Sequence, residues 1–408
     1  MKSSLSVFFF ICLFISCSST NKLSEVNTDS SIFRYTVLAS GDTLFLGGKV
    51  GSLSVFGDSL DNLTLRIPMS YPGVESMYVK KNPNDHTIDR QHFVYNSSYE
   101  FNRELKSYTE DLGEPDSTKS RSNFISYYWD DGTTHFEMIR LASEGKNHSY
   151  SILRNSDALG ETSFNTDKID SYRGNYTVKD IIGRSEVYSM ISGLDSDVLL
   201  GFSSALPDSI LENLTPLVNK HFSTKSLYSH MVDYMSSKSS PRINNSLYEW
   251  LFSDWFLKQS HLIKTYTPEL SIEEFAASLQ NEQPPRERIL AFYAFVEANK
   301  AGEFFLGIQE ASRATSNEIY ASLGFTSEIT EPISDQEKAQ LKQQYNLSIL
   351  VSFLWAMEPL TKAQIQKMTD AYTSDSGIWY VQTYSDALVY SINRAGEELT
   401  LELKESKP

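Results

Sequence analysis

The sequence predicts an α+β fold class: an N-terminal module, mainly antiparallel β-sheet with one helix, followed by an all-α C-terminal domain. Short β-prone runs separated by turn residues occupy residues 32–159, and helical periodicity takes over at residues 207–408. The length of 408 residues exceeds that of a typical domain, so two globular units are expected. Residues 160–206 fit neither pattern and are assigned to a connector, in which 187–191 and 198–202 suit helix or strand equally.

The strands of the first module are predicted from alternation and from turn residues. Leu63, Leu65 and Ile67 alternate on one face, which is the period of a half-buried strand. The remaining short runs rich in aromatic and β-branched residues are 35–38, 44–46, 78–79, 92–95 and 148–153. A hairpin is predicted between 124–129 and 134–141, because Asp131-Gly132 supplies the positive φ that a tight turn requires.

One helix is predicted within this module, at 99–112, where apolar residues recur near helical spacing. The segment Leu112-Gly113-Glu114-Pro115 ends it, as glycine and proline do. This turn, followed by Trp129 at the end of a strand, resembles small α+β modules of bacterial envelope lipoproteins over residues 97–154. The resemblance implies a scaffold or interaction unit rather than an enzyme.

Helix starts in the second domain are predicted from capping boxes at 271–274 and 334–337, which both read Ser-x-x-Glu. The run 347–357 is apolar on nearly every side and predicts a buried central helix. The serine- and asparagine-rich piece 236–246 predicts a long loop.

A short internal repeat relates 301–306 to 376–381, at an offset of 75 residues. Each copy follows one amphipathic helix and starts another. The corner at 372–377 resembles that of an uncharacterised helical family of exported bacterial proteins, over residues 285–395. That family has no established activity, so the resemblance implies nothing catalytic.

The first twenty residues predict export. Lys2 precedes an apolar run at 5–15 that is too short to span a bilayer, and the small residue Ser16 stands directly before Cys17. This layout resembles a bacterial lipoprotein signal, with Phe14 where that family usually has an aliphatic residue.

The resemblance implies a signal peptide at 1–16 and a lipid-bearing, palmitate-carrying Cys17 at the start of a polar tether, 17–31. We therefore expect an exported, cell-envelope protein, held to the outer membrane by its lipid and facing the periplasm. Because the only cysteines are Cys12 and Cys17, the processed body would have no disulfide, thiolate metal site or cysteine nucleophile.

Composition excludes two classes of partner. The net charge of −16 disfavours nucleic acid, whose recognition needs a basic surface, and electrostatic adsorption to anionic lipid headgroups. The expected partners are the membrane, through the lipid anchor, and a protein of the envelope. No phosphate-cradling glycine loop or dinucleotide fingerprint occurs in the sequence, and no cofactor is expected.

The one candidate metal set is His135, Glu137 and His148. Two residues apart on a strand, His135 and Glu137 share a face, and His148 on the next predicted strand would complete the set. The alternative is a sheet face on which polar residues alternate with buried apolar ones. The sequence favours this alternative, and with it no metal.

These observations predict a lipid-anchored envelope protein with a non-catalytic binding or scaffold role. One alternative is a hydrolase acting on envelope polymers, for which Glu249 and Asp254 lie in a tryptophan-bearing run, but at a spacing that turns them to divergent helix faces. Another alternative is a lipoprotein subunit of an envelope assembly machine. No catalytic residue is assigned.

Overall fold

The structure, a computed structural model, describes most of residues 35–405. It does not describe 1–34, 38–42, 50–57, 60–63, 69–73, 83, 85, 96–97, 122–123, 131–133, 142–146, 154–175, 185–186, 204, 252, 254, 257–258, 260–261, 264–265, 327–329 and 406–408. The predicted signal peptide, Cys17, Phe14 and the tether therefore lie outside the described residues. No helix among those described is long and apolar enough to cross a membrane.

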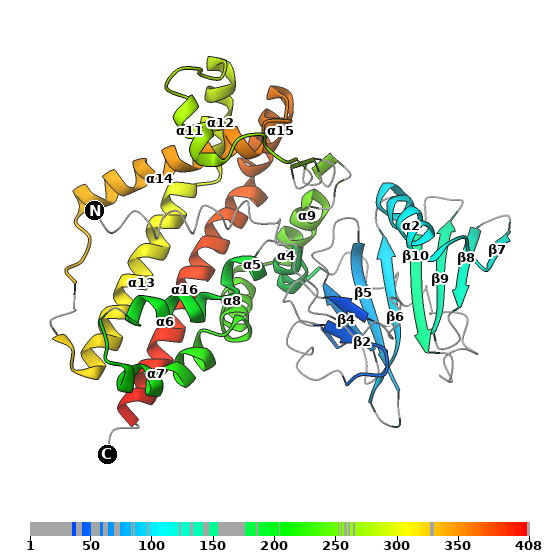
Figure 1. The fold of residues 1–408 in the computed structure, drawn as a ribbon, viewed down its shortest axis with the longest axis horizontal. Helices are drawn as coiled ribbons and strands as arrows, with labels where there is room; N and C mark the ends of the chain where they lie inside the picture. The colour runs from blue at the N-terminus through cyan, green and yellow to red at the C-terminus, as the bar shows by residue number, and fades with distance from the viewer. Residues whose placement is uncertain are drawn as a thin grey trace. The chain divides into compact units, whose positions relative to one another are not determined.

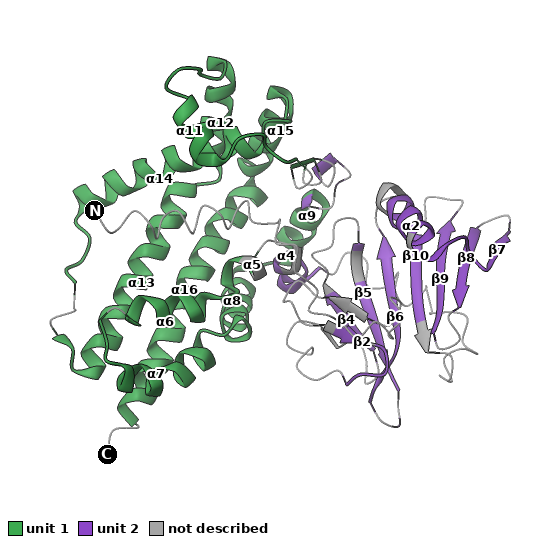
Figure 2. Ribbon diagram, in the orientation of Figure 1, with its two compact units in different colours: residues 1–18, 187–250, 258–408 green, residues 19–186, 251–257 purple. Residues whose placement is uncertain are grey.

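The described residues form two compact units (Figure 2). Residues within 19–186, with 251–257, form the first, here the β unit; residues within 187–250 and 258–408 form the second, here the helical unit. The predicted fold class is confirmed: an antiparallel sheet with one helix comes first, and an all-helical region follows.

Eight of the described strands form one antiparallel sheet in the order β3-β4-β5-β6-β10-β9-β8-β7 (Figure 1). Their bounds are β3 Asp58–Ser59, β4 Thr64–Pro68, β5 Val74–Lys81, β6 Ile88–Tyr95, β7 Ser117–Ser120, β8 Phe124–Asp130, β9 Thr134–Leu141 and β10 Asn147–Leu153. A separate pair joins β1 (Tyr35–Val37) to β2 (Thr43–Phe45). The predicted 124–141 hairpin is confirmed by the pairing of β8 with β9, while its turn lies outside the described residues.

The predicted helix of the β unit is α2, Ser98–Leu112, and it packs on one face of the sheet. Phe101, Trp129 and Phe136 are buried in the core of this face. Gly113 follows α2 at φ +85°, a conformation that glycine adopts without strain. The indole Nε1 of Trp129 donates to the carbonyl of Gly113 at 3.1 Å, so the turn and the tryptophan strand are directly bonded.

The β unit also contains α4, Val178–Arg184, which contacts β4. The helical unit contains α5 Val187–Ile191, α6 Leu194–Ser203, α7 Asp208–His221, α8 Thr224–Lys238, α9 Pro241–Leu251, α11 Ile272–Ser278, α12 Arg286–Ala298, α13 Ala301–Leu323, α14 Asp335–Ala356, α15 Lys362–Tyr372 and α16 Asp375–Glu405. The 31-residue helix α16 packs against α7, α8, α13 and α15, and is therefore the central element of this unit (Figure 1).

Both predicted capping boxes are confirmed. Ser271 and Ser334 accept from the backbone amides of Glu274 and Glu337, whose carboxylates accept in return from the serine amides. The prediction of a buried helix is confirmed over most of its span, because α14 buries Ile349, Leu350, Phe353 and Leu354. It is wrong at Leu347, which is 52% exposed.

The loop predicted at 236–246 is wrong, because α8 runs to Lys238 and α9 begins at Pro241. Serine and asparagine suit helix ends, and Ser240 accepts at its hydroxyl from the amide of Ile243. The segments left open between helix and strand, 187–191 and 198–202, are both helical. The sequence did not predict β7, an exposed strand at the edge of the sheet.

The glycines of the internal repeat mark close backbone approaches. A Cβ added to Gly302 would meet the backbone carbonyl of Lys342 at 2.9 Å and also the side chain of Asn346. At Gly377 it would meet the backbone of Ala371 and Tyr372. Both copies of the repeat therefore place a glycine where a neighbouring segment leaves no room for a side chain.

Candidate binding face

The β unit carries a transverse row of polar and aromatic residues on the sheet face opposite the core. Paired residues of antiparallel strands point to the same side, and one register line crosses six strands. From β4 to β8 it reads Arg66, Tyr78, His92, Tyr150, Glu137 and Tyr128. We call this row, with its neighbours on the same side, the polar face.

The middle of the polar face is buried and holds a pair of histidines. His92 is fully buried, and its Nε2 lies 3.0 Å from Nδ1 of His148. The ring of Tyr150 stacks on His92, with centroids 4.3 Å apart and planes at 14°. Burial, together with the charges of His148 and Arg90, holds the pKa of His92 well below its usual range. Burial also raises the pKa of Tyr150, so both rings stay neutral.

The β4 end of the polar face is closed by α4. Arg66 donates to the carboxylate of Asp180, and both side chains are almost fully buried. Asp180 also accepts from the amide and the hydroxyl of Thr177, at 2.7 and 3.0 Å. A buried carboxylate with this many donors is well satisfied, and the pair ties α4 to the sheet.

The β8–β9 end of the polar face is more open. Tyr128, His135 and Glu137 are half-buried there, and Tyr128 stands opposite Glu137 in the pairing of β8 with β9. Partial burial and Glu137 raise the pKa of Tyr128. The rings of Tyr128 and His135 lie 5.6 Å apart, and the Lys119 ammonium lies 4.7 Å from the centroid of Tyr128. This end combines an aromatic surface, a carboxylate and a cation.

The structure places His135, Glu137 and His148 on one face of adjacent strands, as predicted, but it does not bring them together. The residue opposite Glu137 on β10 is Tyr150, and His148 lies opposite Ile139 with its ring turned to His92. No group of three or more histidine, cysteine or acidic side chains in the described residues could hold a metal ion. Of the other acidic candidates, Glu249 lies on α9, and Asp254 lies outside the described residues.

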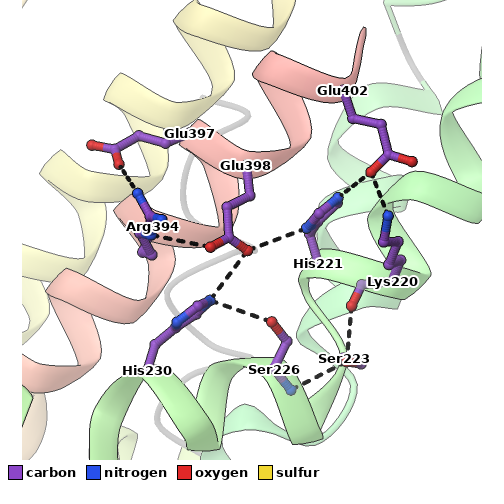
Figure 3. Close-up of polar contacts among 9 residues, drawn as sticks. All are labelled: Lys220, His221, Ser223, Ser226, His230, Arg394, Glu397, Glu398 and Glu402. Carbon is purple, nitrogen blue, oxygen red and sulfur yellow. Dashed lines mark hydrogen bonds and ion pairs between the residues drawn. The ribbon is translucent and has the colours of Figure 1, made fainter. Parts of the chain in front are cut away.

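The helical unit contains a second polar cluster that the sequence did not predict. It joins α7, α8 and α16 through Lys220, His221, His230, Arg394, Glu397, Glu398 and Glu402 (Figure 3). The spacing of Glu398 and Glu402 was the available signal, because residues four apart share a helix face. Their histidine partners lie more than 165 residues away in the chain, beyond the reach of any spacing pattern.

Chemically, the buried part of the polar face is suited to holding strands and α4 together, while its β8–β9 end leaves aromatic, carboxylate and basic side chains half-buried or exposed. The neutral His92 and Tyr150 rings are enclosed, so they do not exchange protons readily with a substrate in solution. Comparison with protein-family models, with curated proteins and with solved structures found no match to this chain.

Proposed function

We propose that this protein is a lipid-anchored protein of the cell envelope that binds a partner protein and catalyses no reaction. The anchor is supported by the order of a basic residue, a short apolar run and Ser16-Cys17. The binding role is supported above all by the β8–β9 end of the polar face, where aromatic, carboxylate and basic side chains stand half-buried or exposed on a rigid sheet.

The directions of the pKa shifts favour binding over catalysis. A general acid or base works best with a pKa near the working pH. Burial instead moves the pKa of His92 down and that of Tyr150 up, which leaves both inert. In the helical unit, hydrogen bonds from Lys220 and His221 lower the pKa of Glu402, so this carboxylate is a weaker base.

The β8–β9 end has the composition of a contact surface. Tyrosine is enriched in protein interfaces because it buries a large rigid ring and still offers a hydrogen bond. The Tyr128 ring is packed between the His135 ring and the Lys119 ammonium, so little side-chain entropy is lost when a partner covers it. The carboxylates of Asp130 and Glu137 favour a partner surface that presents arginine or lysine.

A crosslinking experiment tests the binding role. A photo-crosslinking residue placed at Tyr128 or Ile139 should give a discrete adduct with one envelope protein in cells, and Glu137→Arg should abolish it. The matched control is Thr118, an exposed position on β7 that pairs with Tyr127 and so points to the other face. Equal labelling from Thr118, or no adduct from either test position, would contradict the proposed face.

A separate experiment tests the anchor. The wild-type protein should sediment with membranes and incorporate labelled palmitate, and Cys17→Ala should do neither. Cys12→Ala is the control, because it removes the other cysteine and leaves the proposed lipid site intact. A Cys17→Ala protein that still sediments with membranes would overturn the anchor without touching the binding proposal.

A further inference from the structure

The side chain of Glu137 stands in an aromatic frame at the β8–β9 end of the polar face. Tyr128 is opposite Glu137 on β8, and Tyr150 is opposite it on β10. Along β9, His135 and Ile139 lie two residues before and after it, and therefore on the same side of the sheet. Glu137 is half-buried, so its carboxylate is bordered by three rings and one aliphatic side chain.

The carboxylate of Glu137 has no cationic partner in the described part of the chain, where no lysine or arginine forms an ion pair with it. Lys119, on the neighbouring edge strand, instead lies over the ring of Tyr128, 4.7 Å from its centroid. Burial, and after it the charge of Glu137, raise the pKa of Tyr150, so this charge acts on the rings around it. A half-buried charge without an opposite charge is unfavourable, and an incoming cation would offset that cost.

The rings around Glu137 determine which cation fits best. An ammonium is a compact and strongly hydrated charge. A guanidinium is planar and more weakly hydrated, so it can stack on an aromatic ring while two of its N–H groups donate to one carboxylate. The rings of Tyr128 and His135 both border Glu137, with their centroids 5.6 Å apart, so a group stacked on either ring lies beside the carboxylate.

We propose that Glu137, with the rings of Tyr128 and His135, receives an arginine side chain of the partner protein. This inference rests on the proposed binding role and narrows it, because it selects arginine over lysine and assigns the contact to one carboxylate. Asp130 stands opposite His135 on β8, with Oδ2 3.9 Å from Nδ1 of that ring, and adds a second negative charge at the border of the site.

Methyl NMR on the full-length protein tests the site with three capped peptides: glycine-arginine-glycine, glycine-lysine-glycine and glycine-glutamine-glycine. The reporter is the δ methyl group of Ile139, beside Glu137 on the polar face. The arginine peptide should shift this signal to saturation with a dissociation constant about tenfold below that of the lysine peptide, because only the guanidinium stacks and forks at once. The glutamine peptide, which has no charge, should cause no saturable shift. Ile125 is the internal control, because it pairs with Arg140 and points to the other side of the sheet.

Two variants locate the contact at Glu137. Glu137→Gln keeps the shape of the side chain and removes its charge, so the arginine peptide should bind about tenfold more weakly and no better than the lysine peptide. Glu110→Gln is the matched control, because it removes the same charge from an exposed position on α2. This control should leave the dissociation constants of both peptides unchanged.

The outcomes separate the arginine site from the binding role on which it rests. Equal dissociation constants for the arginine and lysine peptides on the wild-type protein would overturn the site, and this comparison needs no variant to fold. An arginine preference that survives in Glu137→Gln would overturn it as well. If a crosslinked adduct from Tyr128 or Ile139 accompanies either result, the binding role stands and only the arginine site is lost. An arginine peptide that binds as expected, without any adduct in cells, would support the site and contradict the binding role.

Discussion

The corner between α15 and α16 offers a sharp test of the close packing described above. Replacing Gly377 with alanine adds one methyl group in the first turn of α16. That group would contact the carbonyl of Ala371 and lie 2.8 Å from both Cα and the carbonyl oxygen of Tyr372. All three are backbone atoms, and none of them can rotate away as a side-chain tip would. The corner must therefore open to accept the substitution.

The expected effect follows from two opposing contributions. Overpacking costs about 1–3 kcal/mol in the free energy of unfolding. Replacing a helical glycine with alanine raises the free energy of unfolding by up to about 1 kcal/mol, because alanine has the higher helix propensity. Because the obstruction is backbone, we expect Gly377→Ala to destabilise the helical unit by about 1–2 kcal/mol. Gly201 on α6 is the matched control, since nothing lies within 4 Å of its added Cβ. There only the propensity gain applies, and alanine should stabilise.

Urea unfolding of the full-length protein, read by hydrogen exchange of α15 and α16, measures both variants without assuming that the whole chain unfolds in two states. The two substitutions should shift the midpoint in opposite directions. Gly302→Ala, where Lys342 supplies a backbone wall and Asn346 a side chain, should resemble Gly377→Ala. A Gly377→Ala protein as stable as Gly201→Ala would refute the reasoning.

Four further predictions concern polar contacts. Arg66→Met should cost the β unit about 3–5 kcal/mol in unfolding free energy by leaving Asp180 buried without its cation, and the double variant with Asp180→Leu should regain part of this in urea titrations. Because the pKa of Glu402 is lowered, the contribution of this carboxylate to the free energy of unfolding is complete above the unfolded pKa of about 4.3 and is lost as the pH falls through the folded pKa. In a measurement of stability against pH, Glu402→Gln should therefore reduce the loss of stability of the helical unit at acid pH. His92 stays neutral in the folded protein, but in the unfolded chain it takes up a proton below about pH 6.5. The free energy of unfolding of the β unit should therefore fall with pH, by at most about 1.4 kcal/mol per pH unit, and His92→Gln should reduce that slope. Trp129→Phe should cost about 1 kcal/mol by removing the bond to the turn after α2, measured by urea unfolding against the exposed Thr118→Val.

Local signals in the sequence predicted the elements better than the site. Glycine and proline located the end of α2, and serine-glutamate spacing located the starts of α11 and α14, because each signal acts within one helical turn. The loop predicted at 236–246 was wrong because serine and asparagine favour helix ends as well as loops. At Leu347, apolar composition overstated burial, because neighbouring helices cover only part of α14.

The polar face could be predicted only in part, for a physical reason. Alternation placed His135 and Glu137 on one face correctly, since that property belongs to a single strand. Whether His148 or Tyr150 stands opposite Glu137 depends on the register between strands, which spacing along the chain does not contain. The joining of His221 to Glu402 depends likewise on how α7 packs on α16, an interaction across 181 residues.

The titratable groups of the two units affect stability in different ranges of pH. His92 is enclosed and neutral, so acidification favours the unfolded β unit, where the ring can take up a proton. In the helical unit, the hydrogen bonds from Lys220 and His221 lower the pKa of Glu402, so the contribution of this carboxylate is lost only below its unfolded pKa of about 4.3. Between about pH 6.5 and about pH 5, the urea midpoint of the β unit should therefore fall while the contribution of Glu402 to the helical unit stays complete. His92→Gln should reduce the fall in the midpoint of the β unit and leave the helical unit unchanged, and Glu402→Gln should change only the response of the helical unit below about pH 4.3. An equal fall in both midpoints above about pH 5 would contradict this assignment.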